Sequence, residues 1–204
     1  MESYSIFPNP QLTNKGIVSE TFLSLQIRKF QDACSYVHRL PYGYNSTRDD
    51  VLILFKEGFG SCTTKHAVIA TLSEELGIPI DKYVGIYAMD ESLVTGTSRI
   101  LGKYSLPYLP MHHCFLQYQS HRVDLTEGNQ NGKNHSLDTF LYRERVSPTI
   151  SEKDEYFLYK KAVETHILKR EEMRGVSLRA ILLARAEGIA LLHSKIAPQF
   201  LATH

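Results

Sequence analysis

Apolar residues in this chain repeat with two different periods, and the order of these periods restricts the fold. Residues 19–39 and 62–76 carry apolar side chains every three or four positions, which predicts helices with one buried face. Residues 83–89, 113–118 and 122–125 have the character of strands, and the last two are joined by a tight hairpin turn. A third helical stretch is predicted over residues 151–196. Because helices and strands do not alternate regularly, we expect an α+β fold.

Glycine and proline divide the chain into three predicted segments. Residues 1–16 form an irregular lead-in, residues 17–145 form the main domain, and residues 146–204 form a C-terminal helical extension. Residues 91–110 contain two glycines and two prolines and are predicted to be a loop. Gly175 is the expected break between the two C-terminal helices.

The last predicted helix carries apolar residues around most of its circumference. Such a helix packs on the core of its own chain or on a partner. A homodimer through the C-terminal helices is therefore one expectation from the sequence.

Charge and cysteine content exclude several classes of protein. The 23 basic and 22 acidic residues nearly cancel, so we expect neither nucleic acid nor an acidic membrane surface as partner. The most apolar segment, residues 178–192, is interrupted by Arg179, Arg185 and Glu187, so it does not read as a membrane span. The N-terminus shows no secretory signal pattern. Three cysteines make a poor disulfide framework, and we therefore expect a cytoplasmic protein.

Cys62 is the first candidate functional residue. It follows the glycine-flanked segment 57–61 and opens the helix predicted over residues 62–76. A thiol attacks an acyl carbon only as thiolate, and a helix N-terminus favours a negative sulfur. The free amide groups there also suit an oxyanion. Cys34 and Cys114, in contrast, read as small core residues.

His113 and Asp124 lie on the two strands of the predicted hairpin. Neighbouring antiparallel strands would place them side by side, so that the carboxylate holds the imidazole in one tautomer and supports its positive charge. His112 competes with His113 for this role. Successive strand residues point to opposite faces, so only one of the two histidines can face the thiol.

Three motifs in this order resemble the transglutaminase-like superfamily, and microbial transglutaminase-like domain proteins in particular. The match covers about residues 20–127 and includes the nucleophile helix, the histidine strand and an Asp-x-Thr segment. The motifs are Gly60-Ser61-Cys62-Thr63-Thr64-Lys65-His66-Ala67, His113-Cys114-Phe115 and Val123-Asp124-Leu125-Thr126.

The resemblance implies a papain-like core with a Cys62–His113–Asp124 triad. It implies a thiol-dependent acyl-transfer enzyme, with peptidase, amidase or transglutaminase-type chemistry on a peptide, protein or small acyl or amide substrate. The acidic clusters that bind calcium in animal transglutaminases have no counterpart here, so a calcium-dependent protein cross-linker is not expected. The thiol chemistry calls for no metal and no organic cofactor. Ser61, Tyr42 and Tyr44 are candidate residues of the oxyanion site or the cleft.

Two alternatives stay open. The first is a non-catalytic binding or scaffold module that keeps the same fold. The second is a zinc site that combines Cys62 and His66 with the donors at 112–114. The zinc site is disfavoured because Cys114 and His113 would face opposite sides of their strand and no Cys-x-x-Cys pair is present. We expect Lys65 and His66 to lie on the helix surface or to line the cleft.

Overall fold

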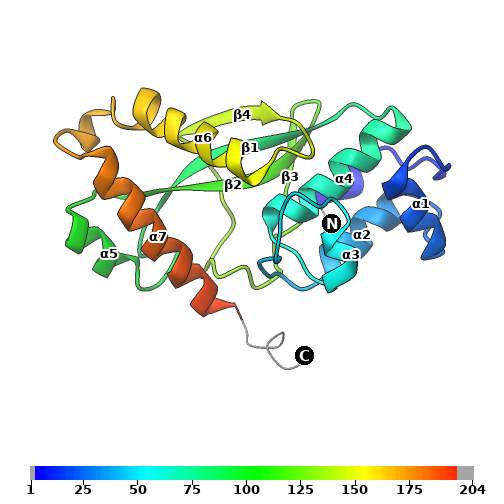
Figure 1. The fold of residues 1–204 in the computed structure, drawn as a ribbon, viewed down its shortest axis with the longest axis horizontal. Helices are drawn as coiled ribbons and strands as arrows, with labels where there is room; N and C mark the ends of the chain where they lie inside the picture. The colour runs from blue at the N-terminus through cyan, green and yellow to red at the C-terminus, as the bar shows by residue number, and fades with distance from the viewer. Residues whose placement is uncertain (1–2, 197–204) are drawn as a thin grey trace. The chain divides into compact units, whose positions relative to one another are not determined.

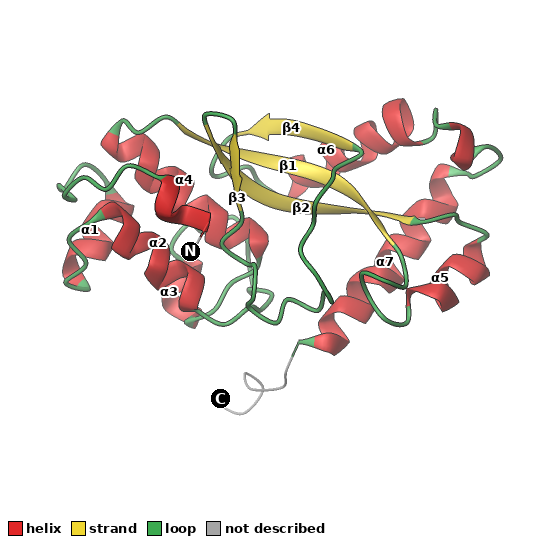
Figure 2. Cartoon of the chain, turned by 180° about the vertical axis from the view of Figure 1, so that it is seen from behind, coloured by secondary structure: helices red, strands yellow, loops and turns green. Residues whose placement is uncertain are grey.

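The computed structural model describes residues 3–196 and has an α+β fold (Figure 1). Its helices are α1 (Ile17–Ser24), α2 (Phe30–Arg39), α3 (Ile53–Glu57), α4 (Cys62–Leu76), α5 (Thr97–Tyr104), α6 (Glu152–Ala162) and α7 (Leu178–Lys195). Its strands are β1 (Ile80–Met89), β2 (Leu109–Tyr118), β3 (His121–Val123) and β4 (Tyr142–Val146). They form one antiparallel sheet in the order β3-β2-β1-β4 (Figure 2). The α+β prediction is thus confirmed. The predicted papain-like core and the three-segment division remain predictions.

The described chain divides into two compact units. The first unit comprises residues up to Val84, Cys114–Asn129 and Glu144–Glu152. The second comprises Gly85–His113, Gln130–Arg143 and the residues from Lys153 onward. Strands β1, β2 and β4 each pass from one unit to the other along the chain.

The first unit has a core built by α1, α2 and α4 with the ends of β2 and β3. Phe22, Phe30, Val68, Leu116 and Val123 are fully buried in it. β2 and β3 pair antiparallel, with Leu116 opposite Val123, as the predicted hairpin requires.

One prediction for the first unit is wrong. Residues 19–39 are two helices rather than one, since α1 ends at Ser24 and α2 begins at Phe30. Gln26 has a φ of 62°, a left-handed conformation that ends a right-handed helix. Leu23 and Ile27, which fit the apolar period, are only half-buried, and α1 buries Val18 and Phe22 instead.

The second unit has its own core, in which α5 and α7 lie side by side (Figure 1). The predicted loop 91–110 is wrong, because it contains α5 and the start of β2. Gly96 stands at the N-cap of α5 with a φ of 101°, and the carboxylate of Glu91 accepts the amides of Gly96 and Ser98 at 2.8 and 2.7 Å. The glycine therefore starts a helix here rather than excluding one. The edge strand β4, whose residues are mostly exposed, was not predicted.

The C-terminal helices follow the prediction more closely. Gly175, with a φ of 81°, lies in the break between a short helical turn at Glu171–Met173 and α7. The helix α7 buries Ile181, Ala184, Gly188 and Leu192, which form one face, so it is not apolar all round in its packing. No helix within residues 3–196 is long and apolar enough to cross a membrane. The homodimer remains a prediction.

Candidate functional site

Cys62 is the first residue of α4, as predicted, and its side chain is 7% exposed. The loop before it is fixed by the backbone: Gly60 donates to the carbonyl of Pro41 at 3.1 Å, and Gly43 donates to the carbonyl of Gly60 at 3.2 Å. A Cβ at Gly60 would lie 2.8 Å from Oγ1 of Thr64, so this position has no room for a side chain. The glycine lets the loop run close to the start of the helix that carries the thiol.

Ser61 is the N-cap of α4, and its hydroxyl is unusual. The side chain is 3% exposed, yet Oγ has no hydrogen-bond partner within residues 3–196. The neighbouring hydroxyl of Thr64 is fully used, since it accepts from the Ser61 amide at 3.0 Å and donates to Oδ1 of Asn45 at 2.7 Å. A buried hydroxyl without a partner is costly unless something else, such as a bound group, satisfies it.

Replacing Ser61 by alanine tests whether its hydroxyl lacks a partner, because the substitution changes the free energy of unfolding. An N-cap serine that holds its helix costs about 1 kcal/mol when it is removed. Here we expect no loss, or a gain of about 1 kcal/mol in the free energy of unfolding, because the substitution removes a buried hydroxyl without a partner. Urea denaturation of the two proteins measures the difference. A loss of 1 kcal/mol or more would mean that the hydroxyl caps the helix in solution.

Tyr42 and Tyr44 lie on the strand-like segment bridged to Gly60. Their rings meet edge to face at 5.9 Å. Burial raises the pKa of Tyr44, and the negative charge of a Cys62 thiolate raises this pKa further. Tyr44 therefore lies near enough to Cys62 to interact electrostatically with its thiolate. Because its pKa is raised, the Tyr44 hydroxyl keeps its proton at neutral pH and can serve as a hydrogen-bond donor.

His66 and Asp124 are joined to the first turn of α4. Nδ1 of His66 lies 2.7 Å from the carbonyl oxygen of Cys62, and Nε2 lies 2.8 Å from the amide of Leu125. A carbonyl only accepts and an amide only donates, so Nδ1 carries the proton and Nε2 does not. His66 is therefore neutral, and the 3.5 Å approach of Nε2 to Oδ1 of Asp124 is not an ion pair. Both ring nitrogens are used, which leaves His66 no free donor for a metal.

Asp124 follows β3 and is 7% exposed. Its Oδ1 accepts from the amide and the hydroxyl of Thr126 at 2.8 and 2.7 Å. The register of β2 with β3, carried one residue beyond Val123, pairs Asp124 with Phe115 rather than directly with His113. Phe115 and His113 share a strand face because they lie two residues apart.

His113 is buried and belongs to the second unit as the last residue of its segment Gly85–His113. Its ring meets the ring of Tyr87 edge to face at 6.5 Å. The structure thus brings Cys62, Ser61, Tyr44 and Asp124 into the first unit, whereas His113 belongs to the second.

His112 has a different role from that of a catalytic base. Arg185 lies 3.2 Å from its Nδ1, and Oε1 of Glu155 lies 2.9 Å from its Nε2. Because a guanidinium only donates, Nδ1 is the acceptor and Nε2 donates to the carboxylate. The guanidinium also stacks on the ring of Tyr159 at 4.6 Å. With both nitrogens used, His112 is a structural residue of the second unit.

The remaining cysteines are buried, as predicted for core residues. Cys34 and Cys114 have no exposed surface, and burial raises the pKa of the Cys34 thiol. Sγ of Cys114 lies 3.6 Å from Oγ1 of Thr63. Within residues 3–196, no group of three or more His, Cys, Asp or Glu side chains is arranged to hold a metal ion.

The expectation for Lys65 and His66 is wrong, because both side chains are fully buried. Lys65 lies four residues before Ile69, at the start of the apolar stripe that continues through Leu72 and Leu76. That spacing was the available signal for its burial.

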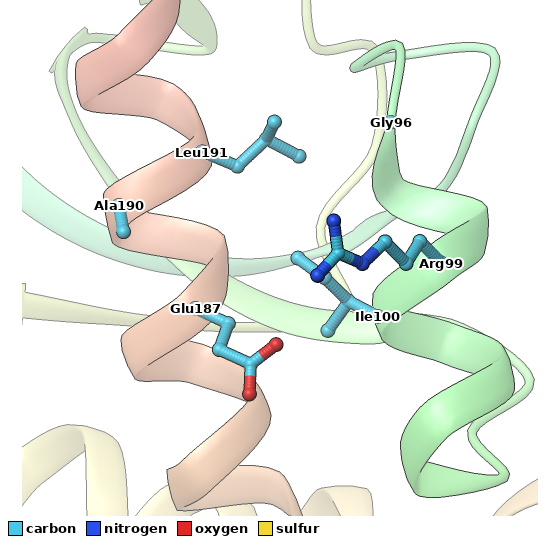
Figure 3. Close-up of a pocket in the computed structure, with 6 residues that line it drawn as sticks. All are labelled: Gly96, Arg99, Ile100, Glu187, Ala190 and Leu191. Carbon is cyan, nitrogen blue, oxygen red and sulfur yellow. The ribbon is translucent and has the colours of Figure 1, made fainter.

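A separate pocket of about 370 Å³ lies between α5 and α7 in the second unit (Figure 3). Figure 3 shows Arg99 reaching from α5 toward α7. The carboxylate of Glu187 on α7 accepts hydrogen bonds from Lys103 and from the hydroxyl of Tyr104. None of the predicted site residues lines this pocket, which is bounded by Gly96, Arg99, Ile100, Glu187, Ala190 and Leu191.

Comparisons of the chain with protein-family models, with curated proteins and with solved structures found no significant match. The fold and the site define an α+β protein with a cysteine at the start of a buried helix.

Proposed function

We propose that this chain is a thiol-dependent acyl-transfer enzyme of the transglutaminase-like type, with a papain-like core. Cys62 is the nucleophile, His113 the general base and Asp124 the residue that orients His113. The substrate class is a peptide, a protein or a smaller amide or acyl compound, and the proposed chemistry needs no metal or organic cofactor.

The observation that carries this proposal is the surroundings of Cys62. Its sulfur stands at the N-terminus of a 15-residue helix, where the helix dipole favours a thiolate. The neighbouring Ser61 hydroxyl has no hydrogen-bond partner within residues 3–196, and the charge of a Cys62 thiolate raises the pKa of Tyr44. A cysteine that serves only for packing needs neither feature.

Two hydrogen-bond paths support the choice of partners. Within the first unit, the ring of His66 bridges the carbonyl of Cys62 to the amide of Leu125, the residue after Asp124. Also within the first unit, Thr63 contacts Cys114. Cys62 is the residue before Thr63, and His113 is the residue before Cys114. The proposed nucleophile and the proposed base are therefore sequence neighbours of two residues that contact each other.

The proposed reaction has two steps. The thiolate of Cys62 attacks the carbonyl carbon, and the amides at the start of α4, with the hydroxyls of Ser61 and Tyr44, stabilise the oxyanion. The C–N bond then breaks as His113 gives its proton to the leaving amine, which leaves a thioester on Cys62. Water or a second amine, deprotonated by His113, attacks the thioester and restores the thiol. Water gives a peptidase or amidase, and an amine gives a transferase.

Alkylation with iodoacetamide at pH 6 tests the proposal without a known substrate. An ordinary thiol with a pKa near 8.5 is almost wholly protonated at pH 6 and reacts slowly. We expect Cys62 to be labelled selectively and about 100-fold faster than free cysteine, which is the gain that a pKa lowered by about two units gives. Mass spectrometry of the digested protein locates the label.

The matched controls are the other two cysteines. Labelling should disappear in C62A and persist in C34A and C114A, because both of those thiols are fully buried. A Cys62 that reacts no faster than free cysteine would support the non-catalytic binding module instead.

A further inference from the structure

Lys65 is a fully buried charge that the proposed chemistry does not use. It stands three residues after Cys62 on α4 and has no exposed surface. Its Nζ donates to the carbonyl of His38 at 3.1 Å, to the carbonyl of Leu40 and to Oδ1 of Asn129 at 2.7 Å. An ammonium has three protons, so these three acceptors satisfy it.

The three acceptors come from two segments of the first unit. The carbonyls of His38 and Leu40 lie at the C-terminal end of α2, which packs beside α4 (Figure 1) and carries partial negative charge. Asn129 belongs to the segment after Asp124, and its Nδ2 also donates to the carbonyl of His38 at 2.7 Å. Lys65 thus ties both segments to the nucleophile helix.

A continuous path of hydrogen bonds leads from Lys65 to Asp124. Nζ of Lys65 donates to Asn129, the amide of Asn129 donates to the carbonyl of Thr126 at 3.2 Å, and Thr126 donates twice to Oδ1 of Asp124. The positive charge of Lys65 is also attracted by the negative charge of Asp124. Because such an attraction is mutual, it favours the ionised carboxylate that an orienting aspartate needs.

We propose that Lys65 is a positioning residue of this site, whose ammonium fixes the segment that bears Asp124 and keeps its carboxylate ionised. The proposal rests on the proposed function. Burying an ammonium is expensive even when it is paired, so packing alone does not account for a lysine at this position. Lys65 acts through Asp124 and does not touch the reacting atoms.

The test is a double-mutant cycle that follows iodoacetamide alkylation of Cys62 at pH 6. We expect K65M to lower the rate about tenfold, as a shift of one pKa unit in the thiol would. If Lys65 acts through Asp124, K65M should have little further effect once Asp124 has been replaced. In the D124N background it should therefore change the rate by less than about twofold, which is the usual scatter between independent substitutions. A full tenfold effect in that background, or no effect of K65M alone, overturns the proposal.

Lys82 provides a matched control. It is also buried, and its Nζ donates to a carbonyl, that of Pro148, at 2.9 Å within the same unit. K82M should therefore lower thermal stability as K65M does, yet leave alkylation of Cys62 within about twofold. An equal loss of reactivity in both variants would mean that Lys65 is merely structural. If K65M does not fold, K65Q replaces it, because glutamine keeps a donor and removes the charge.

The pH profile gives an independent readout. Burial lowers the pKa of Lys65 to about 7, and the attraction of Asp124 opposes this shift. Lys65 is thus charged at pH 6, and K65M should move the rise of the alkylation rate with pH upward by about one unit. His38 belongs to one of the segments that accept hydrogen bonds from Lys65, and its Nδ1 lies 3.2 Å from the carbonyl of Leu125. The variant K65R distinguishes an effect of Lys65 from an effect of His38, because arginine stays charged. In K65R this rise should stay near the wild-type pH, because the positive charge is kept.

The outcomes distinguish the two proposals. Slow alkylation of Cys62 in the wild type overturns the proposed function and this inference with it. Fast alkylation in the wild type, with additive effects of K65M and D124N, overturns only the role of Lys65.

Discussion

Replacing His113 by glutamine is expected to lower the rate of Cys62 alkylation at pH 6 by about 100-fold, the lower range for loss of a general base. The reason is that the thiol then loses the imidazole that takes its proton, and only the helix N-terminus still favours the thiolate. Glutamine is close to histidine in size, so the contact of His113 with Tyr87 is largely kept. Alkylation rates across pH 5 to 9 provide the measurement.

The matched control for this experiment is His112→Gln. His112 is held between Arg185 and Glu155, so this substitution should lower stability and leave the reactivity of Cys62 nearly unchanged. If H112Q slows alkylation and H113Q does not, the two histidines have been assigned the wrong roles.

Replacing Glu155 by alanine is expected to lower the free energy of unfolding by about 2 kcal/mol, as the loss of a charged acceptor from a buried hydrogen bond does. Glu155 is 1% exposed, and its carboxylate accepts from Nε2 of His112, whose Nδ1 accepts from Arg185. Without Glu155, the Nε2 proton of His112 loses its carboxylate acceptor. Urea denaturation followed by circular dichroism measures the change.

Two further variants bracket that result. E155Q keeps the shape and an acceptor, so it should cost only about 1 kcal/mol. The exposed Glu164 is the matched surface control, and E164A should stay within about 0.5 kcal/mol of the wild type. A loss below 1 kcal/mol for E155A would show that the network contributes little to the second unit.

The residues of the candidate site differ in how far the sequence could predict them. Cys62 was found because helix periodicity, a preceding glycine and a thiol at a helix start are all local features. Lys65 was missed because a charged residue on an apolar stripe is normally read as exposed. Its burial depends on carbonyls at His38 and Leu40 and on Asn129, far away in the sequence.

The same distinction holds for the histidines. The sequence placed His112 and His113 on opposite faces of one strand, which follows from the period of two. It could not assign their partners, because Glu155 and Arg185 come from α6 and α7, more than 40 residues later. Nor could it show that both nitrogens of His66 are already used.

The amino-acid sequence by itself determined the helix that begins at Cys62, the hairpin of β2 and β3, and the α+β class. These depend on side-chain period and turn residues within a few positions of one another. Only the tertiary structure decided that α5 replaces the expected loop, that Ser61 Oγ lacks a partner among the described residues and that Lys65 is buried. Burial and hydrogen bonding are set by groups distant along the chain, so no local pattern specifies them.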